Sequence, residues 1–282
     1  MADPRTGRPA RRRCAVVGHP VAHSLSPVMH RAAYAELGLD WTFDAVDVEP
    51  AGLGAWVERL DPTWRGLAVT APHKRDALEL ADDVSDVAAA AGGANTLLLA
   101  DGVVRADNTD VPGTLAALQE AGIADVPLVR VLGAGATASS VAHAVVGLGA
   151  RRMELVVRDV ARAETTAASA RSAGLEVVVR SSDAPFVDVA DLLVSTVPED
   201  AAGARSHELV ESAAAVFDVV YDPWPTRLLL AAHEADRPAV SGLDLLAHQA
   251  ALQLALMTGS RVDVDVLRDA ALAELSAARD VP

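Results

Sequence analysis

The chain has 282 residues, of which 51% are hydrophobic and 22% are charged, and this composition is typical of a globular protein with one large or two ordinary domains. Its formal net charge of −15 disfavours nucleic acid and anionic membranes as partners. A single cysteine excludes an internal disulfide, and we find neither a membrane-spanning apolar run nor a signal-peptide core. We therefore expect a cytoplasmic protein, with residues 1–12 as a disordered arm.

The first hundred residues alternate short apolar runs with helical patterns. Pro27 favours the first turn of a helix, with Ser26 as its cap, and Gly38 favours its end. The dipeptide Asp101-Gly102 between two apolar runs indicates a hairpin. The predicted strands are 14–18, 42–48, 66–70, 96–99 and 103–106, and the predicted helical segments are 28–37, 51–60, 77–81 and 83–91.

From residue 115 the pattern becomes a regular alternation of strands and helices. The predicted strands are 128–132, 153–157, 176–179, 191–196 and 216–219, and the predicted helices are 115–121, 139–148, 160–173 and a tail over 243–278. Strands that alternate with helices predict a parallel sheet covered on both faces, and hence an α/β fold.

A glycine-rich segment follows the predicted strand 128–132. Gly133 permits a tight turn, Gly135 leaves room for a phosphate, and Ala138 completes a G-x-G-x-x-A spacing. The free amide groups at the start of the next helix favour a pyrophosphate. The alternative is an ordinary glycine-rich turn, but the strand before and the helix after favour a dinucleotide cofactor.

The next strand ends where such folds bind the ribose of the cofactor. Arg158 favours the 2′-phosphate of NADP, with Arg162 as a second contact one turn later, whereas Asp159 favours the ribose diol of NAD. An equally good interpretation is that Asp159 caps the helix that follows. The sequence therefore favours NADP and keeps NAD as the alternative.

A polar segment near Lys74 and another ending at Asp110 could supply acid/base chemistry. A hydride leaves a carbinol carbon only if the hydroxyl proton also leaves, which requires a group such as lysine. Taken alone, Lys74 is better explained as a surface residue, and Asp110 as part of a turn.

Seven motif blocks occur in order along the chain. They are residues 17–27 (VGHPVAHSLSP), 66–74 (GLAVTAPHK), 93–96 (GANT), 107–110 (DNTD), 195–198 (STVP), 221–223 (YDP) and 242–250 (GLDLLAHQA). Together, over residues 16–259, they resemble the shikimate dehydrogenase family.

This resemblance implies two domains. An α/β substrate domain takes residues 1–112 and 243–282, and a Rossmann-like parallel-sheet nucleotide-binding domain, residues 113–242, is inserted between them. It implies the catalytic pair Lys74 and Asp110. The implied substrate-binding residues are Ser24, Ser26, Thr70, Asn95, Tyr221 and Gln249. The implied cofactor-binding residues are Gly133, Gly135, Ala136, Arg158, Arg162, Thr196 and Gly242.

The implied reaction is the interconversion of 3-dehydroshikimate and shikimate with NADP(H), in the shikimate pathway of aromatic amino-acid biosynthesis. The alternatives are an NAD-dependent quinate/shikimate or aminoshikimate dehydrogenase and a non-catalytic nucleotide-sensing regulator. Departures from the usual family pattern, such as Ala68 for an asparagine and Val111 for a glycine, leave the cofactor and the preferred ring open, and Asp159 keeps the NAD-dependent alternative. The intact pair Lys74 and Asp110 argues against the regulator. We expect no metal, because His19, His23 and His73 lack partners at ligand spacing and are better explained as structural. We expect a monomer or a homodimer that binds small molecules.

Overall fold

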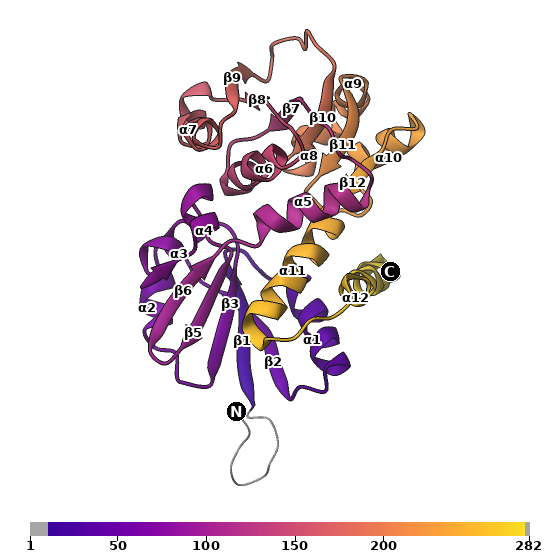
Figure 1. Cartoon of the computed structure of the whole chain (residues 1–282). Coiled ribbons are helices and arrows are strands. Elements are labelled where there is room, and N and C mark those ends of the chain that lie inside the picture. The colour runs from indigo at the N-terminus through magenta and orange to yellow at the C-terminus, as the bar shows by residue number, and fades with distance from the viewer. Residues whose placement is uncertain (1–10, 280–282) are drawn as a thin grey trace. The chain divides into compact units, whose positions relative to one another are not determined.

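The computed structural model describes residues 11–279, which form two compact units (Figure 1). The first unit holds residues 11–89, 93–109 and 246–279, and the second holds residues 90–92 and 110–245. The arm expected over 1–12 lies outside the described residues except for its last two positions, and the first strand begins at Arg12. Within the described part of the chain, no helix is long and apolar enough to cross a membrane.

The first unit is built on a mixed sheet, whose six described strands have the order β2-β1-β3-β5-β6-β4. Its strands are β1 (Arg12–Gly18), β2 (Trp41–Asp47), β3 (Trp64–Val69), β4 (Asp83–Val84), β5 (Thr96–Ala100) and β6 (Val103–Asp107). Strands β1, β2 and β3 are parallel, whereas β5 runs antiparallel to both β3 and β6. The residues that join β5 and β6, Asp101 and Gly102, have φ values of 54° and 77°, which confirms the predicted hairpin.

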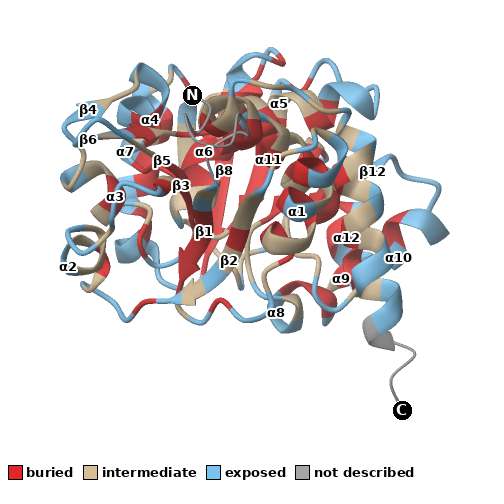
Figure 2. Ribbon diagram, turned by 90° about the horizontal axis from the view of Figure 1, so that it is seen from below, coloured by how far each residue is buried: buried red, intermediate tan, exposed pale blue. Residues whose placement is uncertain are grey.

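Helices flank this sheet, and Figure 2 shows buried strands beside helices with exposed outer faces. The helices of this unit are α1 (Ser26–Glu36), α2 (Leu53–Val57), α3 (Asp76–Glu79), α4 (Asp86–Ala91), α11 (Gly242–Thr258) and α12 (Val264–Arg279). Helix α4 ends, and α11 begins, in the second unit. Cys14 is fully buried in β1, and burial raises the pKa of its thiol to about 11, as expected for an inert cysteine.

Two local predictions in this unit are wrong. The helix expected over 83–91 begins only at Asp86, because Asp83 and Val84 pair with β6 as a short strand. Ser26 does not cap α1: it is the first residue of the helix, Leu25 holds the cap position, and no side chain makes a cap hydrogen bond. Pro27 lies in the first helical turn, as predicted.

The second unit is built on a fully parallel sheet, whose six described strands have the order β12-β11-β10-β7-β8-β9. Its strands are β7 (Leu128–Leu132), β8 (Arg152–Val157), β9 (Glu176–Ser181), β10 (Ala190–Ser195), β11 (Ala213–Asp218) and β12 (Ala239–Ser241). Counted within this unit, the order is 3-2-1-4-5-6, which is the dinucleotide-binding Rossmann arrangement. The order reverses between β7 and β10, where such folds bind their ligand.

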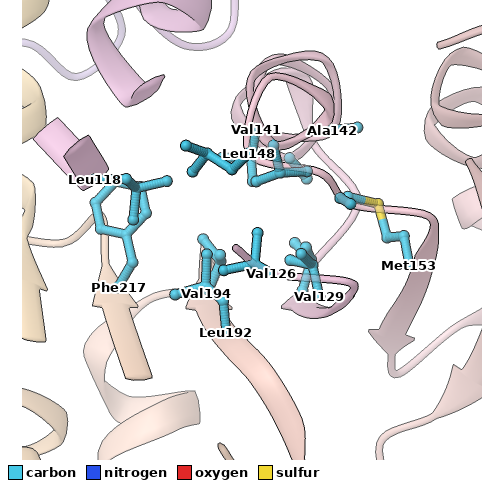
Figure 3. Packing of buried hydrophobic residues seen from close by; sticks show 14 of the residues in the cluster. Leu118, Val126, Val129, Val141, Ala142, Leu148, Met153, Leu192, Val194 and Phe217 are labelled. Atoms are coloured by element: carbon cyan, nitrogen blue, oxygen red, sulfur yellow. The ribbon is translucent and has the colours of Figure 1, made fainter. Parts of the chain in front are cut away.

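The helices of this unit cover its sheet. They are α5 (Asp110–Glu120), α6 (Ala136–Val146), the 3₁₀ turn η1 (Val160–Ala163), α7 (Glu164–Ser172), α8 (Glu199–Gly203), α9 (Ser206–Glu211) and α10 (Arg227–Glu234). One core cluster packs α5 and α6 on the sheet, with Leu118, Val141, Leu192 and Phe217 among its buried residues (Figure 3). Each such large side chain stabilises the fold by about 1.5–3 kcal/mol when fully buried. This packing fixes the start of α6, which carries the glycine-rich turn.

A buried ion pair lies inside this sheet. Arg130 of β7 is fully buried beside Glu154 of β8, and its Nε donates to the carboxylate over 3.0 Å. Its other nitrogens donate to the backbone oxygens of Ser212 (2.9 Å) and Asp188 (2.8 Å). The guanidinium is therefore paired and hydrogen-bonded, which is the condition under which a buried charge is tolerated.

Candidate functional site

Polar residues gather at one edge of the first unit's sheet. Strands β1 and β3 end there, and β5 begins there because it runs in the opposite direction. Asn95, which directly precedes β5, therefore lies level with the end of β3, and its backbone oxygen accepts from Val69 N over 2.7 Å. The backbone N–H of Asn95 donates to Asp107 at the end of β6 over 3.1 Å. Three strand ends thus place side chains in one region.

The side chain of Asn95 is the centre of a buried hydrogen-bond cluster. Its Nδ2 donates to Thr109 Oγ1 over 2.8 Å and to Gln249 Oε1 over 3.2 Å. Its Oδ1 accepts from the backbone N–H of Thr109 and from Thr96 Oγ1, at 2.8 and 2.9 Å. Asn95, Thr109 and Gln249, which we call the amide cluster, are each at most 5% exposed. Amides and hydroxyls can both donate and accept, so this arrangement suits a ligand rich in hydroxyl groups.

The loop after β1 comes to the same edge. The backbone N–H of Thr70 donates to Val17 over 2.9 Å, and a side chain at Gly18 would collide with Thr70. Farther along this loop, Ser24 Oγ accepts from the backbone N–H of Ser26 over 3.3 Å. Ser24 is half-buried and Ser26 is buried. Short hydroxyl side chains held this way can donate to a carboxylate.

Lys74 and Asp110 belong to different units. Lys74 is half-buried and is the only lysine in the chain. Its backbone oxygen accepts from Ala94 N over 2.7 Å, so its segment lies against the residue before Asn95. Asp110 is 6% exposed, begins α5 and follows Thr109 directly. Lys74 is thus hydrogen-bonded to the residue that precedes Asn95, and Asp110 follows Thr109 in the chain.

The glycine-rich turn lies at the point where the parallel sheet reverses its order. Gly133 has φ +100°, and a side chain there would meet Thr196, which follows β10. Gly135 caps α6, and a Cβ built on it meets no atom within 4 Å. Ala136 is the first residue of that helix. The backbone therefore leaves open space at a helix N-terminus, which is the arrangement a pyrophosphate requires.

The residues after β8 separate into two roles. Asp159 Oδ1 accepts from Ala161 N over 3.0 Å and caps η1, which confirms that this carboxylate serves as a helix cap. Arg158 and Arg162 are exposed on either side of it. Gly133 N donates to Val156 O over 2.9 Å, so the end of β8 adjoins the glycine-rich turn. Two cations near a pyrophosphate cradle suit a 2′-phosphate.

Tyr221 and Gly242 both belong to the second unit, and Gly242 lies against the two residues that precede Tyr221. Gly242 begins α11 so close to the backbone of Val219 and Val220 that any side chain there would collide with them. Tyr221 follows these residues and is half-buried. Asp218, the last residue of β11, is 1% exposed, and its carboxylate accepts a hydrogen bond from Thr226 Oγ1 over 2.8 Å. Burial raises the pKa of Asp218 to about 6.

Three contributors to these sites had no role in the sequence prediction. Thr109 completes the amide cluster, Gln253 lies one turn beyond Gln249 on α11, and Thr166 Oγ1 donates to Ala134 O over 2.7 Å and so holds the glycine-rich turn. A polar pair at positions i and i+4 of an otherwise apolar helix is the signal that could have identified Gln253. Thr166 has no comparable sequence signal.

His73 and His19 have hydrogen-bonding partners within the protein. His73 is buried, and its ring nitrogens lie 2.7 Å from Val48 O and 3.2 Å from Asp76 Oδ2. His19 lies 2.6 Å from Asp47 Oδ1, and this contact raises the pKa of the imidazole. Among the described residues 11–279, no group of three or more histidine, cysteine, aspartate or glutamate side chains could hold a metal ion.

Comparison with known proteins identifies the family. Residues 16–97 match the shikimate dehydrogenase substrate binding domain, and residues 242–272 match the shikimate 5′-dehydrogenase C-terminal domain. The shikimate dehydrogenase (NADP(+)) of Methanothermobacter thermautotrophicus is 36% identical over 90% of this chain and 94% of its own. The chain belongs to the shikimate dehydrogenase family.

Solved structures of family members have the same fold. A shikimate 5-dehydrogenase from Mycobacterium fortuitum has a TM-score of 0.83 and 38% identity, and the match covers 93% of this chain and 98% of that one. The shikimate 5-dehydrogenase of Thermus thermophilus, solved in complex with NADP(H) and shikimate, has a TM-score of 0.81 and 36% identity over 93% of this chain and 99% of that one. The two-unit α/β architecture with a Rossmann-like sheet is therefore that of the family.

Proposed function

We propose that this protein is an oxidoreductase that interconverts shikimate and 3-dehydroshikimate with NADP(H), within the shikimate pathway of aromatic amino-acid biosynthesis. The observation that carries the proposal is the amide cluster of Asn95, Thr109 and Gln249, which presents buried amide and hydroxyl groups in a member of the shikimate dehydrogenase family. A polyhydroxylated ring needs such groups, because each buried polar atom of the site must find a partner. The Methanothermobacter relative is named shikimate dehydrogenase (NADP(+)), and the Thermus thermophilus relative was solved in complex with NADP(H) and shikimate.

The substrate would be held by two sets of residues. Ser24 and Ser26 are on a loop whose hydroxyl groups can donate to the substrate carboxylate. Thr70, Asn95 and Gln249 lie at the sheet edge and on α11, where they would bond the ring hydroxyls. Tyr221 would add a contact from the second unit. The specificity would come from hydrogen bonds, because a substrate lacking one of these hydroxyls leaves a buried group unpaired.

Lys74 would transfer the proton, and Asp110 would orient Lys74 and the substrate hydroxyl. When the ring hydroxyl is oxidised, its carbon gives up a hydride and its oxygen gives up a proton, which the Lys74 amine would accept. In the reduction, the ammonium would return that proton to the forming hydroxyl. Asp110 would orient both groups. The neighbouring contacts of Lys74 with Ala94, and of Asp110 with Thr109, support this assignment.

The residues of the second unit fit NADP. When bound, NADP supplies or accepts the hydride. Gly133, Gly135 and Ala136 would bind the pyrophosphate at the start of α6, where the backbone leaves open space. Thr196 directly follows β10 and Gly242 directly follows β12, and both would contact the cofactor from these strand ends. Arg158 and Arg162 would bind the 2′-phosphate, since the carboxylate between them is occupied as a helix cap.

A turnover assay with shikimate and quinate, each with NADP and NAD, tests the proposal. Reduction of NADP with shikimate as the best substrate is expected. Preference for NAD with quinate would instead support the catabolic dehydrogenase. Nucleotide binding without turnover on either ring would support a nucleotide-sensing regulator. The expected partners are small molecules, the expected location is the cytoplasm, and the expected assembly is a monomer or homodimer.

A further inference from the structure

A second glutamine of α11 supports the amide cluster from behind. Gln253 lies one helical turn after Gln249 and is 1% exposed. Its Nε2 donates to the backbone oxygen of Asn95 over 2.9 Å and to Thr96 Oγ1 over 3.1 Å. Gln253 is not needed to touch the substrate in the function proposed above. Its two acceptors, however, are the residue at the centre of that cluster and the residue after it.

The contact with Thr96 determines what the Thr96 hydroxyl can do. This hydroxyl has a single proton, and its oxygen is already an acceptor for Gln253. The proton is donated to Asn95 Oδ1, 2.9 Å away, because an amide oxygen can only accept. The same Oδ1 accepts from Thr109 N over 2.8 Å and lies 3.2 Å from Thr109 Oγ1, so neighbouring donors hold it in place. With Oδ1 held, the Nδ2 group of Asn95 must face Thr109 Oγ1 and Gln249 Oε1.

The far side of Gln253 is closed and uncharged. Its Oε1 is buried without a hydrogen-bond partner, as are both ring nitrogens of His30. The His30 ring is fully buried and stacks on Phe43 at a centroid distance of 4.0 Å. Burial lowers the pKa of His30 to about 4, against the opposing effect of the Gln253 side chain, so the imidazole is neutral at pH 7. The contacts with Asn95 and Thr96 are made by the donor end of Gln253.

We propose that Gln253 is a positioning residue for substrate recognition, which acts through Thr96 and the Asn95 backbone to fix the amide orientation of Asn95. This inference rests on the function proposed above, because it concerns the same amide cluster. It adds a residue that does not contact the ring. The loss of the Gln253 donor removes the contact that holds the Thr96 oxygen in place, so the hydrogen bond from Thr96 to Asn95 Oδ1 is weakened.

The test compares variants that remove the hydrogen bonds from Gln253 to Thr96 and from Thr96 to Asn95 with a variant that keeps them. Gln253→Met keeps the length of the side chain but has no donor, and Thr96→Val keeps the shape but has no hydroxyl. Each should raise the KM for shikimate about threefold to tenfold, as expected for one neutral hydrogen bond, with kcat and the KM for NADP nearly unchanged. Thr96→Ser keeps the hydroxyl and should retain the wild-type KM. The double variant should be no worse than either single one.

Thr258→Val is the matched control, because it removes a hydroxyl from the same helix, where it donates to Leu254 O over 2.7 Å. Its KM should equal that of the wild type. An unchanged KM in Gln253→Met and Thr96→Val, with only a lower Tm, would show a merely structural role and overturn the inference. A crystal structure of Gln253→Met in which Asn95 keeps its amide partners would overturn it as well. Absence of turnover in the wild type would instead reject the proposed function.

Discussion

Cofactor preference can be tested at two adjacent residues after β8. Asp159→Asn should leave NADP turnover intact or raise it, because an asparagine Oδ1 can still accept from Ala161 N while the negative charge disappears. Arg158→Ala should lower kcat/KM for NADP, because it removes the guanidinium that is proposed to bind the 2′-phosphate. The matched control is NAD, which lacks this phosphate and whose kcat/KM should hardly change in Arg158→Ala.

The size of the Arg158 effect follows from its surroundings. A hydrogen bond to a charged group contributes about 1.5–3 kcal/mol, and about 1.4 kcal/mol corresponds to a factor of ten. Arg158 is exposed, so solvent screens the contact and the low end of the range applies. A loss of at least about tenfold in kcat/KM is therefore expected from initial rates at saturating shikimate and fixed ionic strength. Two results together would refute the reasoning: a wild-type enzyme that prefers NAD, and a lower kcat/KM for NAD in Asp159→Asn. They would show that the carboxylate binds the ribose diol.

Three further predictions concern catalysis, binding and stability. Lys74→Ala should lower kcat on shikimate by about 10²–10⁴-fold with little change in KM, and a near wild-type kcat in steady-state assays would reject the proton transfer role. Ser24→Ala with Ser26→Ala should weaken shikimate binding in calorimetry while NADP titration stays unchanged; equal losses would indicate a structural loop. Asp218 has a raised native pKa, so its contribution to stability is full below its ordinary value of 3.8 and is lost as the pH rises through about 6. In urea unfolding, the free energy of unfolding of Asp218→Asn relative to that of the wild type should therefore rise by about 1.4 kcal/mol between pH 5 and pH 8. A difference between the two proteins that does not change with pH would contradict this.

Periodic and turn signals predicted the regular parts of the fold. The strand 128–132 has the bounds of β7, and the glycine-rich turn after it begins a helix. Asp101-Gly102 predicted the hairpin because both residues tolerate the left-handed region. These signals are local, so the sequence alone is sufficient to show them.

Elements that depend on distant neighbours were not predicted. Helices α8, α9 and α10 have five, six and eight residues, which is too short for a helical period to be recognised. The tail expected to be helical over 243–278 is interrupted after Thr258, where Gly259 has φ +74°. The strand β4 exists because β6 pairs with it, which no local pattern records.

The same distinction applies to the candidate site. Asn95 and Gln249 could be identified because motif blocks mark them, whereas their connection through Thr109 depends on residues that are 14 and 140 positions apart. Gln253 is farther still, 158 positions from Asn95. Hydrogen bonds over such separations become visible only when the strands and α11 are placed.

Lys74 is the only lysine of the chain, and this has a practical consequence. Reductive methylation with ¹³C-formaldehyde would label this amine and the N-terminus, and nothing else among the side chains. A single lysine resonance could then report its protonation state in the free protein and with each ligand, without any assignment by mutagenesis. An amine-reactive acylating reagent would likewise modify one lysine, and protection by shikimate would show directly that this side chain faces the substrate.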